Sequence, residues 1–129
     1  MVNGVPVQGD IIKINLNPKQ GHEQQGYRPY ICLSNKIISD VAKIAVFAPI
    51  SNTKRNYPLY IRLQGTKTTG SVLLDQLVTI DYNARNFEFV ESVPPNVIDE
   101  LLTKVVLVLT TGFSYCEIRE TNSLISHFS

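Results

Sequence analysis

The sequence has few of the residues that build metal or redox centres: two cysteines, two histidines and no tryptophan in 129 residues. Cys32 lies in an apolar run and Cys116 lies near the end, and their spacing fits no metal site, so we expect buried thiols of a reducing compartment. His22 and His127 are too few for a histidine-based metal centre. We therefore expect neither a metal ion nor another cofactor.

Signals for membrane insertion or export are also lacking. The N-terminus has no basic-then-apolar segment, and no apolar run reaches the ~18 residues that a membrane span needs. These absences predict a cytoplasmic protein. The net charge of +1 excludes a broadly basic coat for nucleic acid, although binding depends on where cations cluster and not on their sum.

What is present is the composition of one globular domain, with 43% hydrophobic and 18% charged residues. Apolar alternation and short apolar runs predict about six strands with turn signals between them, followed by one long helix. The expected strands are 10–16, 29–33, 43–50, 57–63, 71–74 and 87–90, and the expected helix is 95–111. This order predicts a mainly β fold, a small curled antiparallel sheet or partly open β-barrel with a C-terminal helix.

Local signals refine this outline. Ser34 or Asn35 is expected to cap a short helical turn, and a polar loop, residues 51–56, follows the third strand. Asp75 and Gln76 interrupt an apolar stretch, which indicates a bulge or a strand end aimed at a site. A carboxylate buried there would need hydrogen-bond partners. The long helix has more apolar residues than one packed face needs, which favours deep burial combined with a subunit contact.

The candidate site is a polar loop between the first two strands, residues 20–30. Two glycines and a proline bracket His22, Glu23, Gln24 and Arg28, whose side chains are suited to binding an anion or transferring a proton. On a small β scaffold, function tends to lie in such loops. For each residue taken alone, the alternative is an ordinary surface loop with accidental charges.

Three segments of the chain, in order, resemble the MazF/PemK/Kid family of bacterial toxin–antitoxin endoribonucleases. Residues 9–11, GDI, open the first strand, and residues 21–29, GHEQQGYRP, resemble the family's Gly-x-Glu-Gln-x-Gly-x-Arg-Pro loop. Residues 69–76, TGSVLLDQ, followed by TID at 79–81, resemble its third segment, and residues 49–51 fall where the family ends a strand in Pro-x-Thr or Pro-x-Ser. The resemblance covers roughly residues 9–109, most of one domain.

The resemblance implies a toxin with the curled sheet and terminal helix expected above. It implies a homodimer that cleaves single-stranded RNA, including mRNA, without a metal, by attack of the 2′-hydroxyl to leave a 2′,3′-cyclic phosphate and a 5′-hydroxyl. It also implies a cognate antitoxin whose extended C-terminal segment blocks the RNA-binding surface. On this basis we expect a toxin domain over residues 1–112 and a C-terminal extension over residues 113–129.

The same resemblance assigns roles to particular residues. The expected catalytic residues are Arg28, Ser51, His22, Glu23 and Asp75. The planar guanidinium of Arg28 suits a phosphate, because it forms two hydrogen bonds and stays charged. His22 either shuttles a proton or is merely solvated, Glu23 is a base or holds Arg28, and Asp75 is a base or an orienting group. The expected RNA contacts are Gln24, Tyr27, Asn52, Lys54, Arg55, Tyr57, Thr69 and Gln76.

Two other functions remain as alternatives. Leu73 stands where the Kid-like branch has a catalytic arginine, which would fit an inactive relative that only binds RNA or protein. The third hypothesis is a CcdB-like gyrase poison of the same fold. Such poisons bind their target through a tryptophan-containing C-terminal end, and this chain has no tryptophan.

Overall fold

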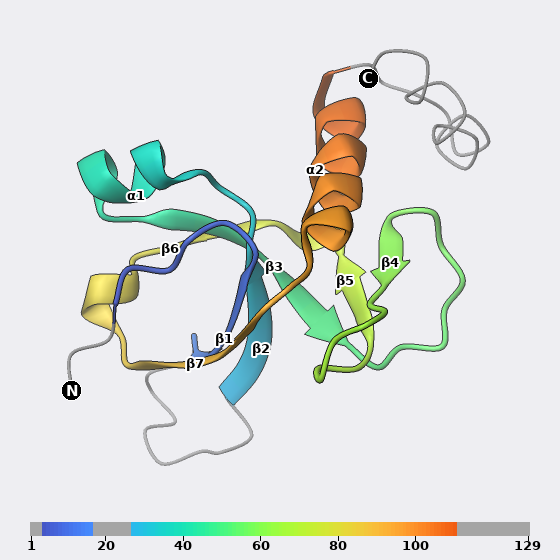
Figure 1. Cartoon of the computed structure of the whole chain (residues 1–129), viewed down its shortest axis with the longest axis horizontal. Helices are drawn as coiled ribbons and strands as arrows, with labels where there is room; N and C mark the ends of the chain where they lie inside the picture. Colours follow the sequence, from blue (N-terminus) through green and yellow to red (C-terminus); the bar gives the residue numbers. More distant parts are fainter. Residues whose placement is uncertain (1–3, 17–26, 111–129) are drawn as a thin grey trace.

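The computed structural model describes residues 4–16 and 27–110 of the chain, and Figure 1 shows their arrangement. In these residues, one sheet built of short and longer strands is followed by one long helix. The elements in order are β1 (Asp10–Asn15), β2 (Tyr27–Cys32), α1 (Lys36–Ala42), β3 (Ala45–Ser51), β4 (Tyr60–Arg62), β5 (Ser71–Leu73), the 3-10 turn η3 (Leu74–Gln76), β6 (Val78–Ile80), the 3-10 turn η4 (Tyr82–Ala84), β7 (Phe87–Ser92) and α2 (Pro95–Thr110). The predicted fold class, a mainly β protein with a C-terminal helix, is confirmed.

Within residues 4–16 and 27–110, the sheet has seven strands, and every pairing between them is antiparallel. The strand order is β4-β5-β3-β2-β1-β7, and β6 pairs with the first half of β3 while β5 pairs with its end. The turn η3 joins β5 to β6. The interruption predicted at Asp75 and Gln76 is therefore a strand end followed by a 3-10 turn, and not a bulge.

The core divides into two clusters, one on each face of the sheet. On the first face, Val97 and Leu101 of α2 pack on strand residues such as Ile11, Ile31 and Val72. The second face holds the other cluster of buried residues, Ile12, Ile14, Tyr30, Cys32, Ala45, Phe47, Ile80, Tyr82 and Phe87. Because successive side chains of a strand point to opposite faces, the central strands are apolar on both sides. This apolar pattern stops at Arg28, near the start of β2, and at Ser51, the last residue of β3.

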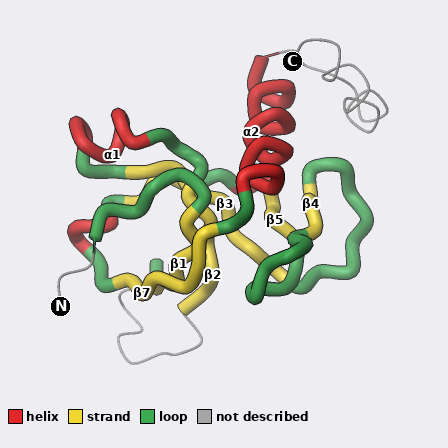
Figure 2. Tube along the Cα trace, in the orientation of Figure 1, coloured by secondary structure: helices red, strands yellow, loops and turns green. Residues whose placement is uncertain are grey.

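Most predicted elements are present, with shifted ends. The strand predicted at 57–63 is paired only over Tyr60–Arg62, and Figure 2 shows the long unpaired loop that leads into it. The helical turn α1 is capped by Asn35, whose Oδ1 accepts hydrogen bonds from the backbone N–H groups of Ile37 and Ile38. The turn η4 was not expected from the sequence. Part of the apolar surplus predicted for α2 is exposed, at Val106 (56%) and Leu109 (68%).

The two ends of the strand order are joined by one side chain of β7. The Glu91 carboxylate accepts hydrogen bonds from the backbone N–H of Lys67 (3.1 Å), the backbone N–H of Thr68 (2.7 Å) and the Thr68 hydroxyl (2.8 Å). Lys67 and Thr68 belong to the turn between β4 and β5, at the other end of the strand order. The sheet is thus curled, as predicted, but it does not close into a barrel through strand pairing.

Cys32 is buried, as predicted, and it lies in the second cluster. Burial raises the pKa of its thiol to about 11, although hydrogen bonds to Ser34 oppose that shift. The thiol is therefore protonated at neutral pH and serves as a small apolar core group. Cys116 lies outside the described residues. In the described part of the chain, no helix is long and apolar enough to cross a membrane.

Candidate functional site

A groove of about 360 Å³ opens on the second face of the sheet, at the ends of β2 and β3. Strands, turn η3 and the residue after β1 all contribute to it. Its lining residues are Leu16, Arg28, Tyr30, Pro49, Ile50, Ser51, Leu73, Gln76 and Val78. We call it the Arg28 groove. Three of the predicted site residues, Arg28, Ser51 and Gln76, meet here from segments that are far apart in the sequence.

Strand register explains why Arg28 and Ser51 share this groove. Tyr30 of β2 lies opposite Pro49 of β3, and Arg28 lies opposite Ile14 of β1. One further step of two residues along the antiparallel pair β2/β3 aligns Arg28 with Ser51 on the same face. Neighbouring strands are about 4.8 Å apart, so the guanidinium and the hydroxyl can reach one phosphate-sized anion.

Among the described residues that line the Arg28 groove, most are apolar, Arg28 is the one cation and none is a carboxylate. Arg28 is exposed, and its guanidinium forms no hydrogen bond or ion pair with any residue that the structure describes. Burial raises the pKa of the neighbouring Tyr30 phenol, and the positive charge of Arg28 partly offsets that rise. A guanidinium without a described ion-pair partner, beside apolar side chains, is suited to binding an anion.

Ser51 and Asn52 are held in place by the turn before β5. Ser51 pairs with Ser71, and Gly70 packs so closely that a Cβ atom on it would lie 2.7 Å from the Ser51 backbone oxygen. Gly70 also has φ +119°, a conformation that side chains rarely adopt. The Thr69 hydroxyl donates to Asn52 Oδ1 over 3.4 Å. Thr69 and Asn52, both predicted RNA contacts, therefore lie together beside the Arg28 groove.

Asp75 differs from the prediction in one respect. It lies in η3 beside Gln76, but its side chain is exposed, so it is not a buried carboxylate that needs partners. A 3-10 turn presents consecutive side chains in different directions. This geometry explains why Gln76 lines the Arg28 groove while Asp75 does not.

The loop between β3 and β4 carries three more predicted RNA contacts. Arg55 Cζ lies 5.2 Å from the centroid of the Tyr57 ring, within the range of a cation–π contact. Tyr57 in turn packs edge to face on Tyr60, with ring centroids 5.0 Å apart. Lys54 is exposed in the same loop. Tyr57 is half-buried and braced on both sides, so it has a packing role whether or not it contacts RNA.

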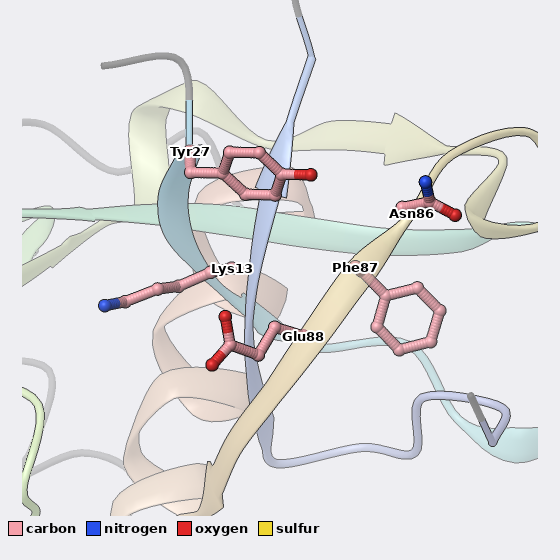
Figure 3. A pocket seen from close by; sticks show the side chains of 5 residues that line it. All are labelled: Lys13, Tyr27, Asn86, Phe87 and Glu88. Atoms are coloured by element: carbon pink, nitrogen blue, oxygen red, sulfur yellow. The ribbon is translucent and has the colours of Figure 1, made fainter. Parts of the chain in front are cut away.

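Tyr27 lies in a different groove. Because it precedes Arg28 in β2, its side chain points to the opposite face of the sheet. It lines a second groove of about 500 Å³ with Lys13, Asn86, Phe87 and Glu88, which Figure 3 shows. We call this the Lys13 groove. Lys13 of β1 and Glu88 of β7 occupy opposing register positions there, so a cation and an anion lie side by side.

Three predicted site residues, His22, Glu23 and Gln24, lie outside the described residues. Other groove residues were not predicted, namely Leu16, Tyr30, Pro49, Ile50 and Val78. Tyr30 could have been found, because it stands two residues after Arg28 in a strand and so shares its face. Val78 could not, because its place depends on β6 pairing with β3 beside β5. In the described part of the chain, no group of three or more His, Cys, Asp or Glu side chains is arranged to hold a metal ion.

The curled antiparallel sheet with its terminal helix, together with an arginine–serine groove at the strand ends, defines a class of small, mainly β proteins. Comparison with known proteins gives the family. Residues 7–109 match the family described as PemK-like, MazF-like toxin of type II toxin–antitoxin system. The chain belongs to this family.

Sequence relatives and solved structures agree with this membership. The chain is 34% identical to Endoribonuclease PemK of Escherichia coli over 108 residues, which cover 80% of this chain and 81% of that protein. It is 28% identical to Endoribonuclease toxin MazF of E. coli strain K12 over 105 residues, covering 81% of this chain and 95% of MazF. The crystal structure of MazF from Deinococcus radiodurans superimposes with a TM-score of 0.69 at 29% identity, covering 83% of this chain and 98% of that one. The MazE–MazF complex from the same organism contains a chain that matches with a TM-score of 0.70 at 24% identity and covers 84% of this chain.

Proposed function

We propose that this chain cleaves single-stranded RNA in the Arg28 groove, using the 2′-hydroxyl of the RNA as nucleophile. That the chain is an endoribonuclease toxin follows from its family and from relatives named endoribonuclease PemK and MazF. The observation that supports the location is the meeting of Arg28, Ser51 and Gln76 in one groove, where none of the described lining residues is a carboxylate. A phosphodiester is the anion in RNA that such a groove suits.

The reaction needs three contributions from the protein. The 2′-hydroxyl oxygen forms a bond to the adjacent phosphorus as its proton passes to a base. The bond from phosphorus to the 5′-oxygen breaks, and that oxygen takes a proton, which leaves a 2′,3′-cyclic phosphate and a 5′-hydroxyl. Arg28 stabilises the negative charge on the phosphoryl oxygens through two hydrogen bonds, and the Ser51 hydroxyl donates a further one.

The proton transfers are assigned to the predicted loop and to η3. His22 suits proton transfer near neutral pH, and Glu23 is placed by the motif to hold Arg28 or to act as base. Asp75 is exposed beside the groove, so it is a candidate base rather than a buried support. Asn52, Lys54, Arg55, Tyr57 and Thr69 extend the RNA surface from the β3 end toward β4, with Gln24 expected on the side of the loop.

A cognate antitoxin is the second proposed partner. Structural neighbours include MazE–MazF complexes, and this chain shares their toxin's fold. An extended antitoxin segment that covers Arg28 would exclude RNA by occupying the same groove. Both partners would meet the toxin in the cytoplasm, where mRNA is translated. Residues 113–129 lie beyond the family match and form an extension that we assign no part in cleavage.

We also propose a homodimer. Val106 and Leu109 expose large apolar side chains one turn apart on α2. A two-fold contact through this surface would bury both copies of it and would place two grooves in one particle. Light scattering should give the dimer mass at micromolar protein, and Leu109→Glu should shift it toward the monomer. A fully active wild-type monomer would contradict this assembly.

The test of cleavage is incubation of the purified protein with mixed-sequence RNA in EDTA. The expected result is discrete cleavage with cyclic phosphate ends, detected by end-labelling before and after acid opening. Antitoxin added before the RNA should suppress it. Activity that disappears in EDTA and returns with Mg²⁺ would contradict the proposed chemistry, and a ternary complex with RNA uncut in the same groove would contradict competition.

A further inference from the structure

Arg62 of β4 lies on the same sheet face as the Arg28 groove, two strands beyond Ser51. It pairs with Ser71 of β5, and Ser71 pairs with Ser51 of β3. Ile61, between Tyr60 and Arg62, belongs to the core cluster under α2, so Arg62 points to the opposite face. One row of side chains thus crosses the sheet from Arg28 through the two serines to Arg62.

Arg62 also adjoins the groove diagonally. Tyr60, its neighbour on the same face of β4, lies opposite Leu73, which lines the Arg28 groove. Diagonal neighbours on adjacent antiparallel strands are about 7–8 Å apart, well within the reach of an arginine side chain. The surface between Arg28 and Arg62 is therefore continuous.

The partners of the arginines separate them into two kinds. Arg55 lies over the Tyr57 ring, and Arg85 donates to the Asn15 backbone oxygen over 3.4 Å. Arg28 and Arg62 are exposed, and among the residues that the structure describes neither guanidinium has a hydrogen bond or an ion pair. Among the described arginines, Arg28 and Arg62 are the two whose guanidinium has no ring contact, hydrogen bond or ion pair with a described residue, and they lie at the two ends of one row on one face.

We propose that Arg62 binds a second phosphate of the RNA, next to the scissile one, so that the substrate strand runs across β2, β3, β5 and β4. This inference rests on the proposed RNA cleavage in the Arg28 groove. Three strand spacings separate the two arginines, about 14 Å between backbones, and both side chains can lean inward to narrow that span. Arg62 does not touch the reacting phosphorus and contributes to binding.

The assignment gives Arg62 a different kinetic signature from Arg28. A contact made equally in the ground state and the transition state changes KM and leaves kcat unaltered. Each phosphate neutralised on a single strand also contributes about 0.7 to the slope of log affinity against log salt concentration. Loss of the Arg62 contact should lower that slope by about this amount.

The experiment compares wild type with Arg62→Gln, Arg62→Lys and Lys36→Gln. Lys36 is exposed at the start of α1, which Figure 1 shows at the far end of the molecule from β4, so its replacement removes one charge elsewhere. A cleaved sequence is first found in mixed RNA. A fluorescein-labelled oligonucleotide of that sequence, with a 2′-O-methyl group at the scissile nucleotide, then reports binding by anisotropy over a salt series.

Arg62→Gln should weaken binding roughly three- to tenfold at low salt, raise KM similarly, leave kcat unchanged and reduce the salt slope. Arg62→Lys should keep the slope, and Lys36→Gln should match wild type. If Arg62→Gln keeps the wild-type slope, or alters antitoxin binding only, the Arg62 proposal is overturned while RNA cleavage stands. A wild-type protein that neither binds nor cuts RNA would overturn both. Thermal melting of each variant separates these outcomes from misfolding.

Discussion

The Arg28 groove and the Lys13 groove lie on opposite faces of the same sheet and differ in charge. Among the described residues, the lining of the Arg28 groove includes one arginine and no carboxylate. In the second, which Figure 3 shows, Lys13 has Glu88 at the opposing register position. The described lining of the larger groove therefore carries no net charge, whereas that of the smaller groove carries one positive charge.

The two grooves also show that neighbouring residues of a sequence motif point to opposite faces of the sheet when the motif continues into a strand. Tyr27 and Arg28 are neighbours in the motif and were both predicted to contact RNA. Because Tyr27 and Arg28 lie in β2, they point to opposite faces. Arg28 faces Ser51, while Tyr27 faces Lys13 and Glu88. The following predictions test this division, beginning with the largest expected effect.

Arg28→Ala should lower kcat by about 10²–10³, equivalent to ~2.7–4 kcal/mol of transition-state stabilisation, by analogy with loss of an oxyanion donor. Among the described lining residues, no second cation is present to replace it. Arg28→Lys should also be poor, because an ammonium group cannot form the two-pronged contact. Since Arg28 is exposed, the melting temperature should stay near that of wild type. Near-normal cleavage by a folded Arg28→Ala protein would place the phosphate elsewhere.

Gly70→Ala should both destabilise the protein and impair cleavage. The new Cβ would lie 2.7 Å from the Ser51 backbone oxygen, and the positive φ adds strain of about 1–3 kcal/mol. Relief of the clash shifts the Ser51 backbone or the turn that holds it, and either shift disturbs the position of the Ser51 hydroxyl in the groove. Chemical denaturation and kcat measure the two effects.

Gly65→Ala is the matched control for this substitution. Gly65 is in the same turn with φ +74°, but nothing lies within 4 Å of its added Cβ. It should therefore show the backbone strain without the loss of cleavage. Equal losses of cleavage in the two variants would mean that the contact between Gly70 and Ser51 does not position the groove.

Glu91→Gln should lower stability and weaken its dependence on pH. Burial raises the pKa of the Glu91 carboxyl, but hydrogen bonds from Lys67 and Thr68 outweigh burial and hold the pKa below its usual value of 4.5. The folded state thus binds the proton less tightly than the unfolded state. The stabilisation is present above the unfolded pKa and is lost as the pH falls through the folded pKa.

Denaturant unfolding at neutral pH and at acid pH measures this contribution. Loss of charge-assisted hydrogen bonds at Glu91 should cost about 1–3 kcal/mol near neutral pH and much less in acid. Glu88→Gln, on the same strand, is the control, because Glu88 is exposed. If both variants lose stability equally at every pH, then Glu91 does not tie the β4–β5 turn to β7.

How far the sequence predicts this site depends on whether contacts are local or depend on strand order. The fold class and the helix cap at Asn35 follow from alternation and capping signals near each residue. The pairing of Arg28 with Ser51 follows only from the register of β2 and β3. Arg62 stands between the apolar residues Ile61 and Leu63, and this alternation predicts that its side chain points away from the core. No local signal in the sequence, however, indicates that β5 lies between β3 and β4. Asp75 was misjudged because an apolar neighbourhood in sequence does not reveal a 3-10 turn.

The smallest effect is expected for Lys13→Gln, which decides whether RNA also uses the second face. Lys13 carries the same charge as Arg62, and both are exposed on strands. The difference is that Glu88 lies opposite Lys13, so a phosphate there would meet an anion as well as a cation. RNA affinity, KM and the salt slope should therefore stay within about twofold of wild type, because a net-neutral pair contributes little counterion release. A slope reduced by about 0.7, as predicted for Arg62→Gln, would instead extend the RNA path around the edge of the sheet to the Lys13 groove, which Tyr27 lines.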